Sequence, residues 1–479
     1  MRARVAVGVV LPAIVLAGLG GYAVADAYDV VPGFITAEPI PPEPAPFLTA
    51  APALAAAPEE GVVSPISADA PLPDAATVQK FAQELRDDER TGKSTNVSVI
   101  DLLTGETLAD LGATDIQVPA STTKLLTAIA AVTDMGPDYT TTTSVNWDET
   151  TRTLTLVAGG DMMLAADAGH GGAEESPNGW AGMGDLADAV VDSLGSATVE
   201  AGPVTVAVDD FLFEAPAVNP EWPQYALDLG YVAPASGVAV DVARTTDEHY
   251  AQRYPDPSVA AADVLAERLA ERGVTVEAAT EDDFTTRAAA SAASVEVASV
   301  ESAPLSAVVR LLLEESDNTV SEIVSLVHAL EVGKPSTAAG AAAATQETLA
   351  GMGVNTAGLT LYDGAGFSEN NRITPLQLSS ATAAAVAAQP TADLLDWMPI
   401  SALTGTLNAR MHETPAAGQV RAKTGSLTGV TTLAGAIQTA DGRWLAFAVL
   451  MDGMDYGQTQ PQAALDEFLV ALAECGCEG

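Results

Sequence analysis

The chain has 479 residues, enough to bury two or three separate cores. Its formal net charge of −44 comes without any cluster of Lys and Arg, so nucleic acid is excluded as a partner. Two cysteines at the C-terminal end and four scattered histidines indicate neither a disulfide framework nor a metallopeptidase site, and no cofactor is predicted.

The N-terminal end carries an export signal. Two arginines precede an apolar run from residue 5 to about residue 25 that ends in small residues, which predicts a signal peptide or N-terminal membrane anchor over residues 1–28. The run approaches the ~20 apolar residues that span a bilayer, so cleavage and retention both stay open. Either outcome places the rest of the chain outside the cytoplasm, where it is secreted, in the cell wall, or anchored with its bulk facing outward.

Residues 29–75 are rich in Pro and Ala, which predicts an extended linker. Apolar residues then recur at helical spacing over residues 76–87, and residues 96–103 alternate as in one strand of an antiparallel pair. A further helix begins near Ser121, and the apolar residues over 125–130 predict that it is buried.

The interval between Ser121 and Ser316 is far longer than a pair of helices needs, so we expect an inserted module over residues 136–296. Thr- and Val-rich runs over residues 140–157 predict a hairpin, and residues 204–208 predict another strand. The insert is therefore expected to be mixed, with substantial β structure.

The last third of the chain alternates between helical and strand patterns. Residues 304–313 and 318–330 show helical spacing, which places Ser316 in the turn between two helices. Three strands follow, at 419–423, 431–439 and 443–451, with a hairpin turn at Asp441 and Gly442 and with Lys423 on an edge strand.

Ser121 is the candidate nucleophile, since Lys124 lies one helical turn along on the same face. A lysine acts as a base only when it is neutral, which requires burial and a nearby positive charge that Lys423 is placed to supply. The amides of Ser121 and Ser426 are candidate oxyanion donors, and Gly425 lets a substrate backbone approach closely.

Three motifs occur in order: Ser-x-x-Lys at 121–124, Ser-Asp-Asn at 316–318 and Lys-Thr-Gly at 423–425. Together they resemble those of penicillin-binding proteins and serine β-lactamases. Asp-Gly-Ala-Gly-Phe-Ser at 363–368 and the long insert narrow the resemblance to low-molecular-mass D-alanyl-D-alanine carboxypeptidases/endopeptidases with inserted domains. This resemblance implies an α+β fold, an antiparallel sheet flanked by helices, built from residues 76–135 and 297–479 as one discontinuous peptidase domain.

The resemblance also implies a mechanism on peptidoglycan stem peptides. Ser121 attacks the penultimate D-Ala carbonyl, Lys124 accepts its proton, Ser316 relays a proton to the departing D-Ala amine, and water releases the acyl-enzyme. β-Lactam antibiotics are expected to act as covalent inhibitors at the same serine.

The same resemblance implies the substrate contacts. Asn318 holds the substrate amide, while Lys423 with Thr424 or Ser426 binds the terminal carboxylate. Asp209 is a candidate to bind the free amine of a diamino acid, although a surface turn is the other interpretation.

Two features depart from the family pattern: Ala365 and Phe367 stand where Ser and Leu are usual, and we expect neither to abolish activity. The alternative functions are a serine β-lactamase, which would have to deacylate quickly, and a catalytically silent scaffold protein of the cell wall.

Overall fold

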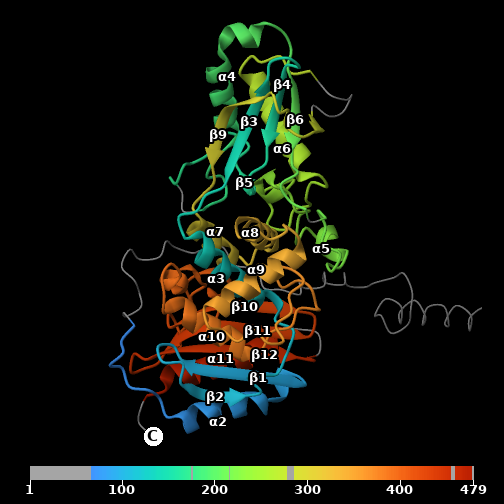
Figure 1. Ribbon diagram of the computed structural model, residues 1–479. Helices are drawn as coiled ribbons and strands as arrows, with labels where there is room; N and C mark the ends of the chain where they lie inside the picture. Colours follow the sequence, from blue (N-terminus) through green and yellow to red (C-terminus); the bar gives the residue numbers. More distant parts are fainter. Residues whose placement is uncertain (1–65, 174–175, 215, 278–284, 455–458, 477–479) are drawn as a thin grey trace, which may run out of the picture. The chain divides into compact units, whose positions relative to one another are not determined.

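Figure 1 shows the computed structural model, which describes residues 66–173, 176–214, 216–277, 285–454 and 459–476. The predicted signal peptide or anchor lies outside the described residues, as does the linker up to residue 65. Among the described helices, none has the length and apolar character needed to cross a membrane.

Helices and short 3-10 turns account for much of the described chain. The α-helices are α2 (Ala75–Arg86), α3 (Thr123–Met135), α4 (Met183–Glu200), α5 (Tyr225–Asp228), α6 (Pro257–Glu271), α7 (Leu305–Glu314), α8 (Asn318–Glu331), α9 (Ala338–Gly351), α10 (Pro375–Val386) and α11 (Thr459–Glu474). The 3-10 turns are η1 (Glu89–Thr91), η2 (Ala120–Thr122), η3 (Asp241–Ala243), η4 (Ala392–Trp397) and η5 (Gly405–Leu407).

The principal sheet joins the two ends of the described chain. Its strands, in the order β10-β11-β12-β1-β2, are β10 (Val420–Leu427), β11 (Val430–Gln438), β12 (Trp444–Asp452), β1 (Ser94–Asp101) and β2 (Thr107–Leu111). All neighbours are antiparallel, and β1 pairs with β12 along its whole length, so the blue and red strands of Figure 1 form one sheet. The predicted antiparallel sheet flanked by helices is confirmed.

Alternate residues of strand β12 serve two different cores. Phe447 and Val449 pack with helices α2 and α11 on one face of the sheet, whereas Ala448 and Leu450 pack with α3, α7, α8 and α10 on the other. A period of two along a strand sends successive side chains to opposite faces, which is why this strand is apolar throughout. The second face is the one that carries the motif helices.

A second sheet lies between the first two motifs in the chain. Its strands, in the order β8-β6-β4-β3-β9, are β8 (Thr285–Arg287), β6 (Thr205–Asp209), β4 (Thr153–Val157), β3 (Thr142–Asp148) and β9 (Val295–Glu301), and β5 (Asp161–Leu164) pairs separately with β7 (Val238–Val240). Two of its neighbour pairs are parallel and two antiparallel, so the insert is mixed with substantial β structure. Strand β9 runs across residue 296, the expected end of the insert, and the domain boundaries stay a prediction.

One buried ion pair ties the principal sheet to the first described residues. Arg443 forms a two-pronged pair with Asp101, with nitrogen to oxygen distances of 2.6 and 2.7 Å, and both side chains are at most 5% exposed. Arg443 also donates to the carbonyls of Ala68 and Ala70. Asp101 therefore compensates the positive charge of Arg443, which is buried in the turn between β11 and β12.

We predict that Asp101→Ala lowers the free energy of unfolding by about 3–5 kcal/mol, because it leaves the Arg443 guanidinium buried without its partner. Urea denaturation of the purified protein measures this. Glu84→Ala is the matched control, since it breaks the exposed Lys80–Glu84 pair and should change stability little. Equal effects of the two substitutions would contradict the prediction.

Candidate active site

Ser121 lies in a strained turn at the start of helix α3. Ala120, just before it, adopts a left-handed φ of 48°, which is uncommon outside glycine. The Thr122 hydroxyl donates to the Pro119 carbonyl at 2.6 Å and fixes the turn. Gly366 packs against it so closely that a Cβ there would lie 1.9 Å from the Ala120 carbonyl oxygen. The residues around Ser121 therefore hold the nucleophile at the helix N-terminus.

Lys124 joins three separate parts of the chain. Its Nζ lies 3.0 Å from Ser121 Oγ, 2.8 Å from Asn318 Oδ1 and 2.6 Å from the Ala365 carbonyl oxygen, and it donates to all three as an ammonium. A neutral amine has two N–H groups, which Asn318 and Ala365 accept, and its lone pair then faces the Ser121 hydroxyl. This arrangement is that of a base ready to take the serine proton.

Burial, and not the surrounding charges, favours the neutral amine of Lys124. Burial lowers the pKa of this fully buried lysine to about 7, while the carboxylates of Asp363, Asp317 and Glu322 act in the opposite direction. The charge expected from Lys423 is itself disfavoured, because burial and then the charge of Lys124 lower the pKa of Lys423 well below its usual value. Desolvation, and not a neighbouring cation, supplies the base.

Lys423 lies on β10, an edge strand as predicted, and its Nζ donates to the Thr424 carbonyl at 2.9 Å. Gly425 follows, where a Cβ would lie 2.2 Å from Thr432 Oγ1 and 3.0 Å from the Ser121 backbone nitrogen. The absent side chain therefore makes room for the nucleophile turn, and the expected approach of a substrate backbone at Gly425 stays a prediction. Lys423 and Ser121 come together because of this contact.

The open edge of β10 presents backbone amides. The amides of Val420 and Ala422 donate away from β11, to Ser401 Oγ and the Pro399 carbonyl. Strand alternation directs the Ser426 amide to the same side, so it stays a candidate oxyanion donor with the amide of Ser121.

The hydroxyls beside these amides differ in their contacts. Thr424 Oγ1 lies 2.8 Å from Thr406 Oγ1. Ser426 Oγ is buried and has no hydrogen-bond partner among the described residues. This hydroxyl is therefore available to form a hydrogen bond with a polar ligand at the edge of β10.

The Ser-Asp-Asn motif lies where α8 begins. Asp317 caps this helix, its Oδ1 accepting from the Val320 amide at 2.9 Å, and Ser316 has a left-handed φ of 61°. Asn318 Nδ2 donates to the Tyr231 carbonyl at 3.0 Å, so this amide joins Lys124 to the insert. Ser316 is partly exposed, and no contact within the described residues joins it directly to Ser121.

The loop over residues 363–368 supplies contacts that sequence reasoning missed. Its first residue, Asp363, accepts five N–H donors: the amides of Gly366, Phe367 and Ser368, Asn371 Nδ2 and Trp222 Nε1. Ala365 takes part only through its backbone carbonyl, which explains why Ala is acceptable where the family usually has Ser. Phe367 packs on Tyr225 of the insert, with ring centroids 6.1 Å apart.

Asp209 ends strand β6, and its Oδ2 accepts from the Ala290 amide at 2.8 Å, a contact inside the insert. The structure does not join it to Ser121 through any contact of the described residues.

The glycines at 159 and 160 form a tight turn, where a Cβ on Gly159 would lie 1.8 Å from the Thr142 carbonyl.

A serine with a buried lysine base, at a helix start beside the edge strand of an antiparallel sheet, defines a serine acyl-transfer enzyme of the penicillin-binding type. The chain belongs to the D-Ala-D-Ala carboxypeptidase 3 (S13) family, whose model matches residues 77–255 and 243–474. The predicted family is thus confirmed, and the protein is a serine-type D-Ala-D-Ala carboxypeptidase.

Known proteins agree with this assignment. Carboxypeptidase DacB of Mycolicibacterium smegmatis is 33% identical over 449 residues, which cover 92% of this chain and 91% of the relative. A carboxypeptidase of Mycobacterium tuberculosis is 31% identical over 428 residues, covering 87% and 88%. The crystal structure of penicillin binding protein 4 from Haemophilus influenzae has a similar fold, with a TM-score of 0.65, 18% identity, and coverage of 84% of this chain and 98% of that one.

We predict that the rate at which penicillin acylates the protein falls as the pH drops below about 7. Lys124 must be neutral to accept the serine proton, and protonation through its pKa of about 7 removes the base. Stopped-flow measurement of acylation between about pH 5 and pH 9, roughly two units either side of that pKa, gives the profile. Lys124→Met should be slow at every pH, whereas Lys334→Met, which removes a lysine paired with Glu347, should keep the wild-type profile.

Proposed function

We propose that Ser121 attacks the penultimate D-Ala carbonyl of a peptidoglycan stem peptide while Lys124 accepts the serine proton. The observation that carries this proposal is the three-way contact of Lys124 Nζ with Ser121, Asn318 and Ala365. The two N–H groups of the neutral amine donate to Asn318 Oδ1 and to the Ala365 carbonyl, so the lone pair of Nζ points toward the Ser121 hydroxyl. Attack by Ser121 Oγ gives a tetrahedral intermediate whose oxyanion faces the amides of Ser121 and Ser426. The acyl-enzyme forms when this intermediate collapses, the C=O bond is restored and the C–N bond to the departing D-Ala breaks.

The departing amine needs a proton. Ser316 is the proposed relay from Lys124, since it lies two residues before Asn318, whose side chain contacts that lysine. Water then attacks the acyl-enzyme, and the same base accepts a proton from it.

Recognition of the C-terminal carboxylate is proposed for Lys423, Thr424 and Ser426. Burial and the charge of Lys124 disfavour a charged Lys423 in the free enzyme, and an incoming carboxylate provides the compensating negative charge. Ser426 Oγ, buried and without a partner among the described residues, is the donor available to the same carboxylate. A site built in this way favours a free chain end.

The proposed setting is extracytoplasmic, with membrane attachment only through the N-terminal anchor if that segment is retained. Cutting of cross-links follows the same chemistry with a longer leaving group, and products from intact cross-linked wall material distinguish it from trimming.

Asp209, whose carboxylate accepts a hydrogen bond from the Ala290 amide, keeps its proposed role toward the amine of a diamino acid. β-Lactams are proposed to acylate Ser121; the Haemophilus influenzae penicillin binding protein 4 is also known in complex with a β-lactam.

We predict that Ser121→Ala abolishes both D-Ala release from a pentapeptide and labelling by fluorescent penicillin, because no other hydroxyl lies against Lys124 in the described contacts. Ser306→Ala, in the first turn of α7, is the control and should retain both. Survival of D-Ala release in Ser121→Ala would refute the assignment. Stable labelling of the wild type supports a peptidase, rapid turnover of the label a β-lactamase, and absence of labelling a scaffold.

We predict that Ser426→Ala raises KM for the peptide about 10- to 150-fold and changes kcat less, because a hydrogen bond to a charged group contributes about 1.5–3 kcal/mol. Steady-state kinetics with a D-Ala-D-Ala peptide measure the split. Thr428→Ala, exposed in the turn after β10, should leave both parameters unchanged. An unchanged KM in Ser426→Ala would remove this residue from the carboxylate site.

A further inference from the structure

The insert contains a turn of unusual backbone geometry close to the Ser-Asp-Asn motif. Three successive residues that are not glycine adopt left-handed φ values: Asp241 at 46°, Val242 at 52° and Ala243 at 58°. Side chains with a Cβ disfavour this region, and such strain persists only where the surroundings hold it. Strained backbone of this kind concentrates at functional sites, which directs attention to the side chains that the turn positions.

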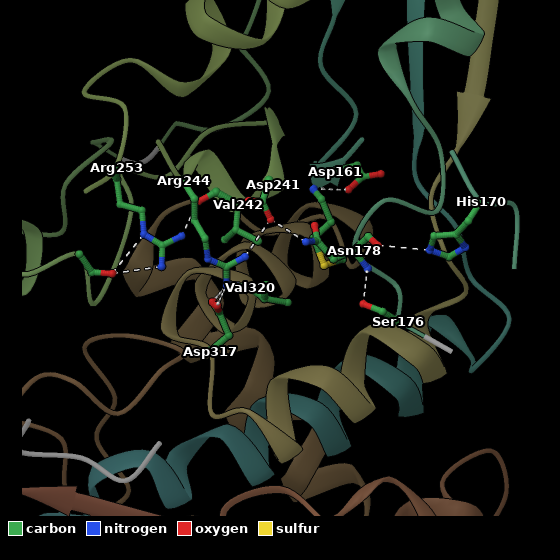
Figure 2. A network of polar contacts seen from close by, with 12 residues as sticks. Asp161, His170, Ser176, Asn178, Asp241, Val242, Arg244, Arg253, Asp317 and Val320 are labelled. Atoms are coloured by element: carbon green, nitrogen blue, oxygen red, sulfur yellow. Dashed lines mark hydrogen bonds and ion pairs between the residues drawn. The ribbon is translucent and has the colours of Figure 1, made fainter. Parts of the chain in front are cut away.

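Hydrogen bonds hold the turn from both sides, as Figure 2 shows. Asp241 Oδ1 accepts from Asn178 Nδ2 at 2.6 Å and from Arg244 Nη1 at 2.9 Å. The Val242 carbonyl accepts from Arg253 Nη1 at 2.8 Å, and the Val242 side chain is buried. The turn is therefore rigidly placed by its neighbours in the insert.

Arg253 extends this frame to the catalytic residues. Its other nitrogens donate twice to the Gly230 carbonyl, at 3.1 and 3.0 Å. The next residue, Tyr231, provides the carbonyl that accepts from Asn318. One network thus connects the strained turn with the amide that contacts Lys124.

The turn presents Arg244 to Asp317. Arg244 Nη2 lies 3.7 Å from Asp317 Oδ2, and the two side chains are 11% and 7% exposed. Arg244 Nε is buried without a hydrogen-bond acceptor among the described residues, so the guanidinium acts here chiefly through its charge. Asp317 lies between Ser316 and Asn318 and caps the helix that they open.

We propose that Arg244 is a positioning residue for acyl transfer: it balances the charge of Asp317 and holds the Ser-Asp-Asn segment, so that Lys124 remains a neutral base. This inference rests on the proposed role of Lys124. The insert would then contribute to the charge balance of the active site, because Arg244 is the only cation that forms an ion pair with Asp317 among the described residues.

The charges around the pair determine the sign of the effect. The groups that face Arg244, Asp317 or Lys124 are Asp241, His249, Tyr250, Arg253, Glu315, Glu322, Asp363 and Lys423. Asp317 acts to raise the pKa of Lys124. Burial, then Asp317, raises the pKa of Glu315 to about 7, and Arg244 opposes this. Loss of Arg244 leaves Asp317 unbalanced, which stabilises the Lys124 ammonium.

The test is the pH profile of penicillin acylation for the full chain. Arg244→Gln should move the acidic midpoint upward by about half to one pH unit, which slows acylation below the midpoint roughly threefold to tenfold. Arg244→Lys, which keeps the charge, should lie between the wild type and Arg244→Gln. Asp317→Asn removes the opposing charge but keeps an oxygen for the helix cap, so its midpoint should move downward.

Arg272→Gln is the matched control, because it removes an arginine that pairs with Asp188 elsewhere in the insert, at 2.6 Å. It should leave the midpoint in place. An unmoved midpoint in Arg244→Gln, or an Arg244→Lys profile no closer to wild type, overturns the inference. If Arg244→Gln does not fold, Asp241→Ala, which removes the acceptor of Arg244 Nη1, is measured against the same criterion. Acylation that survives Ser121→Ala refutes the proposed function itself, whereas an unmoved midpoint with normal Ser121 dependence refutes only the role of Arg244.

Discussion

The catalytic centre depends on keeping one lysine out of water. Lys124 is fully buried, and burial alone brings its pKa to about 7 against three carboxylates that oppose the shift. A buried amine without partners would destabilise the fold, so its hydrogen bonds must come from groups that carry no additional negative charge. The Asn318 amide and the Ala365 carbonyl meet this requirement, and both come from segments far from Lys124 in the chain. Folding therefore creates the base.

The insert takes part in this centre through its contacts with the motif residues. The Tyr231 carbonyl accepts from Asn318, the Ala233 amide donates to Thr319 Oγ1 at 2.9 Å, and Trp222 Nε1 donates to Asp363 at 3.1 Å. These contacts reach two of the segments that surround Lys124. A change within the insert can therefore alter acyl transfer as well as substrate choice.

Local patterns predicted the parts of the site that are local. Ser121 and Lys124 lie one turn apart on a single helix, and Lys423 lies in a strand that turn residues delimit, so short windows contain their signal. The pairing of β1 with β12 has no such signal, because it joins strands from opposite ends of the chain. Ala365 acts through its backbone, and Arg244 pairs with Asp317, which is far from it in the chain, so neither leaves a recognisable side-chain pattern.

The acids beneath Lys124 show why the site tolerates so much negative charge. Asp363 is fully engaged with N–H donors, whereas Glu322 accepts from the Gly364 amide at 2.8 Å and from Asn219 Nδ2 at 3.4 Å. Burial, followed by the nearby Asp363, raises the pKa of Glu322 to about 8. Glu322 therefore holds its proton more readily than an ordinary glutamate, which weakens its stabilisation of the Lys124 ammonium. The hydrogen bonds to Asp363 hold the loop over residues 363–368 in place, and the raised pKa of Glu322 limits how strongly this pair of acids opposes a neutral Lys124.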